Sequence, residues 1–136
     1  GSWQTAQDAK AMEGCTRCNG DVVVVPARRA ADGRKTWLAI QSIPQSRSRD
    51  HLGFFYREVP RRGADLAATL AEGWQRGAMI HEGTAAYSTL SVFGDGSVGI
   101  LFEANLDSDN TGYDILFSRL SIDQITGGAY TSRTSK

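Results

Sequence analysis

Apolar and polar residues alternate with a period of two along most of the chain. This period is typical of β-strands with one buried face, because successive side chains of a strand point to opposite sides of a sheet. Clusters of Gly, Pro, Asp and Ser separate the alternating runs, as turns between strands require. The pattern predicts strands over residues 21–25, 36–42, 51–59, 86–93, 97–103 and 113–121.

Three further segments have a different character. Gly94-Asp95-Gly96 separates two of the predicted strands, and Asp-Gly between alternating runs indicates a tight hairpin. Residues 64–74 have helical composition, but Gly73 limits the predicted helix to about two turns. Residues 127–136 are polar and carry no core pattern, so we expect a tail there.

The predicted fold class is all-β, with short strands at nearly even spacing. Such spacing is typical of sandwiches, barrels and propellers. A propeller blade takes roughly 40–50 residues, so a chain of 136 residues would hold about two or three antiparallel blades, too few to close a ring. The alternative is a complete small β-sandwich.

The charges balance, with 15 Lys plus Arg against 15 Asp plus Glu. A neutral chain has no net field that favours nucleic acid or an anionic membrane surface, so neither is an expected partner. No apolar run reaches the length of a transmembrane helix, so we expect no membrane span. Gly1-Ser2 is expected to be a cloning remnant.

The two cysteines form a single C-x-x-C motif, Cys15 and Cys18. A structural zinc site needs four ligands, and His51 and His81 lie far along the chain in no ligand pattern. We therefore predict no metal site. The cysteines are expected to be buried or half-buried thiols, or a local disulfide if the protein is secreted.

Four motifs follow one another along the chain, and their order is more specific than any one of them. They are GCTRCNGDVVVVP, SRSRDHLGFFY, HEGTAAYSTLSVFGDGSVGILFEAN and YDILFSRLSID. Together they resemble the C-terminal part of the sialidases (exo-α-neuraminidases), glycoside hydrolases built on a six-bladed β-propeller. The resemblance covers residues 13–126 and implies two to three blades of that propeller. Residues 1–12 would be leader residues or a lead-in strand, and residues 127–136 the polar tail.

The resemblance implies a role for three residues. Tyr87 matches the catalytic nucleophile, Arg49 matches one of three arginines that clamp the substrate carboxylate, and Glu103 matches a glutamate that supports another arginine of that triad. A neutral phenol suits this reaction, because the anomeric carbon carries a carboxylate that would repel an anionic nucleophile. The chemistry needs no metal or organic cofactor. Without this context, a strand tyrosine is usually a packing residue.

Other catalytic groups of the family have no counterpart in the chain. Ile43-Pro44 lacks the arginine of the family's Arg-Ile-Pro motif, and the acid/base aspartate has no match. We therefore expect activity only together with the N-terminal part of the same enzyme, acting on sialylated glycans in a secreted, periplasmic or cell-surface location. The alternatives are a trans-sialidase, or a non-catalytic carbohydrate-binding or interaction module derived from a sialidase.

Two segments resemble the Asp-box turn of the same family. In ADGRKTW the glycine follows the aspartate one position too early, so Thr36-Trp37 is interpreted as the start of a strand. Residues 70–77 keep Gly73 and Trp74 but lack the Asp and Thr, which makes them a degenerate box at best.

Overall fold

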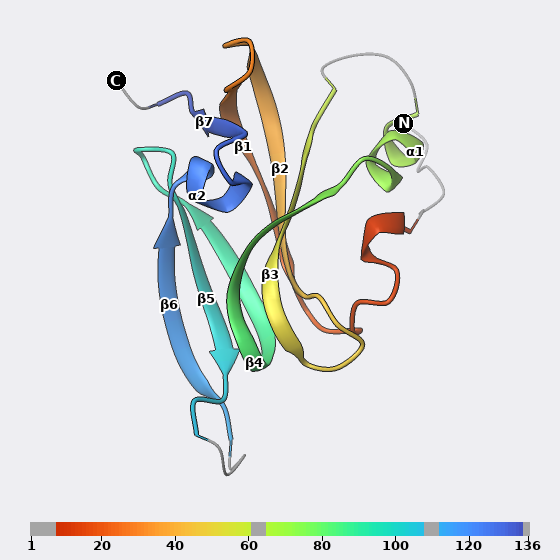
Figure 1. Cartoon of the computed structure of the whole chain (residues 1–136), viewed down its shortest axis with the longest axis vertical. Coiled ribbons are helices and arrows are strands. Elements are labelled where there is room, and N and C mark those ends of the chain that lie inside the picture. The colour runs from red at the N-terminus through yellow and green to blue at the C-terminus, as the bar shows by residue number, and fades with distance from the viewer. Residues whose placement is uncertain (1–7, 61–64, 108–111, 135–136) are drawn as a thin grey trace, which may run out of the picture.

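The computed structural model describes residues 8–60, 65–107 and 112–134. Over these residues, seven strands form one antiparallel sheet in the order β6-β5-β4-β3-β2-β1-β7 (Figure 1). The strands are β1 (Asp21–Arg29), β2 (Lys35–Pro44), β3 (Asp50–Glu58), β4 (Gln75–Val92), β5 (Val98–Ala104), β6 (Asp114–Leu120) and β7 (Tyr130–Ser132). The short helices are η1 (Lys10–Met12), α1 (Leu66–Ala71) and α2 (Ile122–Thr126). The predicted all-β class is confirmed.

The long strand β4 belongs to two parts of the sheet. Residues 75–84 pair with β3, and residues 85–92 pair with β5. The sheet bends along β4, so that its two parts form two layers (Figure 1). We call β7, β1, β2, β3 and the start of β4 the larger half, and the end of β4, β5 and β6 the smaller half.

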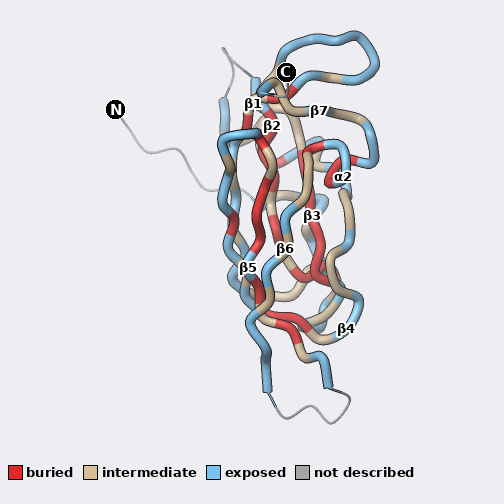
Figure 2. Tube along the Cα trace, turned by 90° about the vertical axis from the view of Figure 1, so that its left-hand side faces the viewer, coloured by how far each residue is buried: buried red, intermediate tan, exposed pale blue. Residues whose placement is uncertain are grey.

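The hydrophobic core lies between these two halves. Alternate side chains of the strands point into it, which gives the repeated buried positions in Figure 2. Ile122 and Ile125 of α2 are fully buried against the same core. The largest fully buried side chains in this core are Val25, Leu38, Ile40, Leu52, Phe54, Val98, Ile100, Ile122 and Ile125.

The outer face of the larger half is partly covered by η1 and α1. Phe55 is 1% exposed although it points away from the core between the halves. Arg57 of β3 donates hydrogen bonds to the carbonyls of Thr69 and Glu72 at the end of α1. The Asp65 side chain caps the start of α1, and the hydrogen bonds from Arg57 hold the end of this short helix over the sheet. Among the described helices, none is long and apolar enough to cross a membrane.

The first residues of β1 join the larger half to the smaller half. The Asp21 carboxylate accepts hydrogen bonds from the Leu90 backbone (2.8 Å) and the Thr89 hydroxyl (2.9 Å) of β4. The Ser88 backbone N–H donates to the carbonyl of Asn19 (3.2 Å). The hydrogen bond from Leu90 holds the pKa of Asp21 below its usual value, although burial opposes the shift. We call this contact the Asp21 clasp.

The other edge of the larger half is held by Glu58. Its carboxylate accepts two hydrogen bonds from the Arg29 guanidinium, each 2.9 Å long, and one from the Tyr130 hydroxyl (2.9 Å). Tyr130 also packs edge-to-face on Tyr56, with ring centroids 5.9 Å apart. These contacts fix β7 beside β1, which it pairs with over Ala27–Arg29.

The hairpin predicted at Gly94-Asp95-Gly96 is confirmed. The Phe93 N–H donates to the Ser97 carbonyl (2.9 Å), and the Asp95 side chain accepts from the Ser97 N–H (3.0 Å). Gly96 has φ 81°, in the left-handed region that favours glycine.

Several predicted boundaries were wrong. β1 continues through Pro26 to Arg29, because the pairing with β2 extends past the proline while the Pro26 carbonyl accepts from the Arg133 N–H. β4 begins at Gln75 rather than at residue 86, since Gly77 and Gly83 broke the alternating pattern without breaking the strand. The strand start at Lys35–Thr36 agrees with the interpretation of ADGRKTW.

The end of the chain also differs from the prediction. The expected tail, residues 127–136, contains β7, and Tyr130 packs on the core. Helix α2 was missed, although Ser121 and Gln124 form a complete capping box at its start. The predicted helix over 64–74 is shorter, ending at Ala71. Gly1-Ser2, Ala64 and residues 135–136 lie outside the described residues.

Candidate functional site

Tyr87 lies where β4 passes from one half of the sheet to the other. Ala85 pairs with Ala104 and Ser88 pairs with Phe102, so two residues of β4 lie opposite the single residue Glu103. This arrangement is a β-bulge, which bends a strand and changes the direction of a side chain. The Tyr87 side chain is 43% exposed, so its phenol is accessible to a ligand.

Arg49 reaches Tyr87 from the loop between β2 and β3. Its guanidinium carbon lies 5.4 Å from the centre of the Tyr87 ring, a cation–π distance. The Ala85 N–H donates to the Arg49 carbonyl (2.8 Å), which fixes the loop to β4 next to the bulge. The pKa of Arg49 is raised, chiefly by a hydrogen bond with the Tyr113 side chain and then by attraction to Cys18 and Tyr87.

Glu103 of β5 lies across the bulge from Tyr87. Its carboxylate accepts a long hydrogen bond from the Tyr87 backbone N–H (3.4 Å). Both residues border a surface cavity of about 300 Å³. Its lining residues are Asn19, Tyr87, Ser88, Thr89, Leu101, Phe102, Glu103 and Ile115. Arg49 is not one of them and joins the site through the Tyr87 ring.

The structure therefore brings together the three residues selected from the sequence. Arg49 comes from the larger half, Glu103 from the smaller half, and Tyr87 from the bend between them. Chemically, the group offers a phenol as a nucleophile or hydrogen-bond partner, a guanidinium that suits a carboxylate, and a carboxylate that suits a second cation. The individual roles of these residues stay predictions.

Two neighbours of the site were missed in the sequence. Tyr113 contributes to the raised pKa of Arg49, and Asn19 lines the cavity. Tyr113 stood at the start of a predicted strand, which gave no reason to single it out. Asn19 directly follows the C-x-x-C motif, and only the fold shows that this segment lies against β4.

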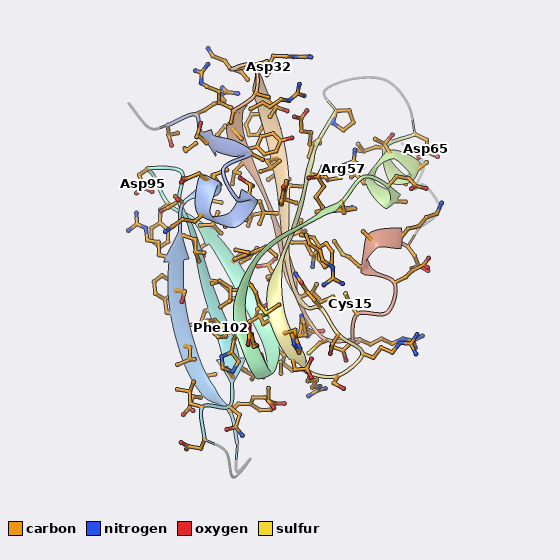
Figure 3. All side chains as sticks on the ribbon, viewed as in Figure 1. Cys15, Asp32, Arg57, Asp65, Asp95 and Phe102 are labelled. Atoms are coloured by element: carbon orange, nitrogen blue, oxygen red, sulfur yellow. The ribbon has the colours of Figure 1, made fainter. Side chains whose placement is uncertain are left out.

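Cys15 and Cys18 are free, half-buried thiols, as one of the two alternatives predicted. Burial raises the pKa of both thiols, and attraction to Arg76 and Arg49, respectively, opposes this rise. In Figure 3, Cys15 lies on the side of the sheet that carries η1 and α1. Within the described residues, no three His, Cys, Asp or Glu side chains are grouped so that they could hold a metal ion.

Comparison of the chain with protein-family models and with curated proteins finds no match. A functional assignment therefore depends on the ordered motifs of the sequence and on the geometry around Tyr87.

Proposed function

We propose that this chain is the C-terminal segment of a retaining exo-α-sialidase, with Tyr87 as the nucleophile. One observation carries the proposal: the Arg49 guanidinium lies 5.4 Å above the Tyr87 ring, while Glu103 accepts a hydrogen bond from the Tyr87 backbone. The three residues lie far apart along the sequence. A resemblance that selects them and a fold that joins them support the same site.

The proposed chemistry follows from the charges of this group. Arg49 binds the carboxylate of the sialic acid, which lies on the anomeric carbon. The Tyr87 oxygen attacks that carbon as the glycosidic bond breaks, and a base removes the phenolic proton. Water then releases the sugar, and the second inversion restores the original configuration. An acceptor sugar in place of water would give the trans-sialidase alternative.

Glu103 would hold another arginine of the carboxylate clamp. Its backbone partner, Tyr87, keeps it beside the nucleophile. That arginine, the acid/base aspartate and the base for Tyr87 would come from the N-terminal part of the same enzyme, which completes the propeller. General acid–base groups contribute roughly 10²–10⁴-fold in rate, so we expect little turnover without that part.

The exposed apolar surface is consistent with such a larger assembly. Exposed apolar side chains that lie next to one another, such as Leu101 and its cross-strand partner Phe117, usually mark an interaction site. Five apolar side chains on β1, β5 and β6 are each at least 44% exposed: Val22, Val24, Leu101, Ile115 and Phe117. In the proposal, packing against other parts of the propeller covers them.

Covalent trapping tests the nucleophile directly. A difluorinated sialic acid transfers its sugar to the nucleophile with loss of fluoride, and peptide mass spectrometry would find the adduct on Tyr87. In the full-length enzyme, Tyr87→Phe is expected to abolish the adduct and to lower turnover of a fluorogenic sialoside at least about a hundredfold. Tyr130→Phe is the matched control, since Tyr130 does not line the cavity. Unchanged turnover in Tyr87→Phe would refute the assignment.

Intact-mass analysis of the native protein separates the enzyme from the binding module. We expect the N-terminal part to accompany this chain. Finding this polypeptide by itself, with no sialoside turnover, would overturn the enzyme assignment for it and favour the non-catalytic carbohydrate-binding module.

A further inference from the structure

A second surface cavity, of about 370 Å³, lies at the end of β3. Arg57 and Glu58 of β3 and Gln75 at the start of β4 are among its lining residues. Arg49 directly precedes β3 and Glu58 ends it, so roughly 25–30 Å of extended strand separates this cavity from the candidate site. Among the described residues, the two cavities share none of their lining, so the second cavity is a separate feature of the fold.

The negative charge in this cavity is already neutralised. The Glu58 carboxylate accepts two hydrogen bonds from Arg29 and one from the Tyr130 hydroxyl, each 2.9 Å long. Arg29 and Tyr130 also line the cavity. A carboxylate has about four acceptor positions, and three of those on Glu58 are in use. Arg29 is balanced in turn, because it also pairs with Asp32 (3.0 Å). These groups form a satisfied wall of the cavity.

Arg57 carries a positive charge that is not balanced in this way. Its Nε donates to the Glu58 carbonyl (2.8 Å), and its Nη1 donates to the carbonyls of Thr69 and Glu72 at the end of α1 (Figure 3). In the part of the chain that the structure describes, Arg57 forms no ion pair with a carboxylate. Its Nη2 donates no hydrogen bond to those residues. Three carbonyls therefore fix the guanidinium, while two of its N–H groups stay free for a ligand.

Two neighbours of Arg57 make the cavity accessible and rich in donors. Gly73 lines the cavity, and a Cβ there would lie 3.8 Å from the Arg57 Cζ, so the glycine leaves this side of the guanidinium uncovered. Gln75 is exposed, and its Oε1 accepts from the Tyr56 hydroxyl (3.1 Å). The Gln75 side chain therefore offers its amide N–H groups to a ligand, as Arg57 does.

We propose that this cavity binds a small oxyanion, a carboxylate or phosphate group, through Arg57. The planar donors of a guanidinium match two oxygens of either group. The carbonyls hold Arg57 before a ligand arrives, so binding costs little ordering of this long side chain. The volume is at the lower end of the range for ligand pockets, roughly 300–1,000 Å³, which suits a small molecule. This site goes beyond the proposed function and does not depend on it.

An NMR titration of the isotope-labelled chain tests whether the cavity binds an oxyanion. Sodium phosphate and sodium succinate are the two probes, and sodium chloride at matched ionic strength is the control. We expect saturable shifts of the Arg57 and Gln75 backbone amides with at least one probe, with a Kd on the order of 1 mM. The probe that binds more tightly identifies the phosphate or the carboxylate as the preferred group. Shifts that do not saturate, or that match those in chloride, would overturn the proposal.

An isosteric change tests the place of binding. Gln75→Glu keeps an acceptor for the Tyr56 hydroxyl and adds a negative charge to the cavity, so it should raise the Kd about tenfold. Gln124→Glu is the matched control, because it adds the same charge outside the cavity lining and a capping box accepts Glu in place of Gln. We expect its Kd to stay within about twofold of the wild type. Equal effects of the two changes would show that only net charge matters and would overturn the site.

Removal of the cation tests the role of Arg57. Arg57→Gln should abolish saturable binding, since it removes the charge and the guanidinium fork. Arg57 also holds the end of α1, so circular dichroism and a thermal melt check that the variant is folded. A folded Arg57→Gln that binds as the wild type does would overturn the assignment. If the variant does not fold, the comparison of Gln75→Glu with Gln124→Glu still decides the proposal.

Discussion

Replacing Asp21 by alanine is expected to lower the free energy of unfolding by about 2 kcal/mol. The Asp21 carboxylate accepts three hydrogen bonds, from the backbone N–H groups of Val22 and Leu90 and from the Thr89 hydroxyl. The bond from Leu90 is partly buried and the other two are exposed, so we assign about 1 kcal/mol to the first and about 0.5 kcal/mol to each of the others.

The predicted loss should depend on pH. The pKa of Asp21 is lowered in the folded protein, so the ionised carboxylate stabilises the fold above its unfolded pKa of about 4. This contribution disappears as the pH falls through the folded pKa. The difference in stability between wild type and Asp21→Ala should therefore be complete at neutral pH and should shrink below about pH 4.

Urea unfolding followed by circular dichroism measures this difference in free energy, and a thermal melt measures the matching change in Tm. At neutral pH, a loss of about 2 kcal/mol corresponds to a Tm lower by roughly 6–8 °C for a chain of this size. Asp114→Ala, at an exposed aspartate of the edge strand β6, is the control and should leave the Tm almost unchanged. Equal stability of Asp21→Ala and the control at neutral pH would refute the idea that the Asp21 clasp joins the two halves.

Two further changes test other contacts of the fold. Glu58→Gln removes the charge that holds Tyr130 at the edge of the sheet, and amide hydrogen exchange in β7 should become about tenfold faster, with little change in β5. Gly96→Ala should cost about 1–3 kcal/mol, because φ is 81° and a Cβ would lie 1.9 Å from the Ser132 hydroxyl. Gly94→Ala, where a Cβ meets no atom within 4 Å, should be nearly neutral in the same melt. Faster exchange in β5 rather than in β7 would contradict the account of Glu58. Equal Tm values for Gly96→Ala and Gly94→Ala would contradict the account of Gly96.

Local patterns in the sequence predicted most of the strands and the β4–β5 hairpin. The hairpin depends on Asp95 and Gly96, whose preferences act over a few residues. The first part of β4 was not predicted, because Gly77 and Gly83 hide the alternation. Both glycines have close neighbours, since a Cβ on Gly77 would lie 2.5 Å from the Ile125 carbonyl and one on Gly83 would lie 2.9 Å from the His81 ring. Gly77 serves tertiary packing against α2, which periodicity does not reveal, whereas the neighbour of Gly83 lies on the same strand.

The candidate site was also predictable from the sequence only in part. Arg49, Tyr87 and Glu103 were selected from ordered motifs, but no pattern of the sequence gives the contact of Arg49 with the Tyr87 ring. That contact depends on the register between β4 and β5 and on the bulge opposite Glu103. Asn19 enters the site because its carbonyl accepts from the Ser88 N–H, a contact between segments far apart along the chain that no local pattern encodes.

Because both layers share strand β4, the distances within the candidate site depend on the angle between the two layers. Arg49 moves with the larger half, Glu103 moves with the smaller half, and Tyr87 lies at the bend that connects them. A rotation of one layer against the other would change the Arg49–Tyr87 and Tyr87–Glu103 distances together. Tyr87 reports such a rotation because the strand that carries it is 18 residues long and pairs with both layers.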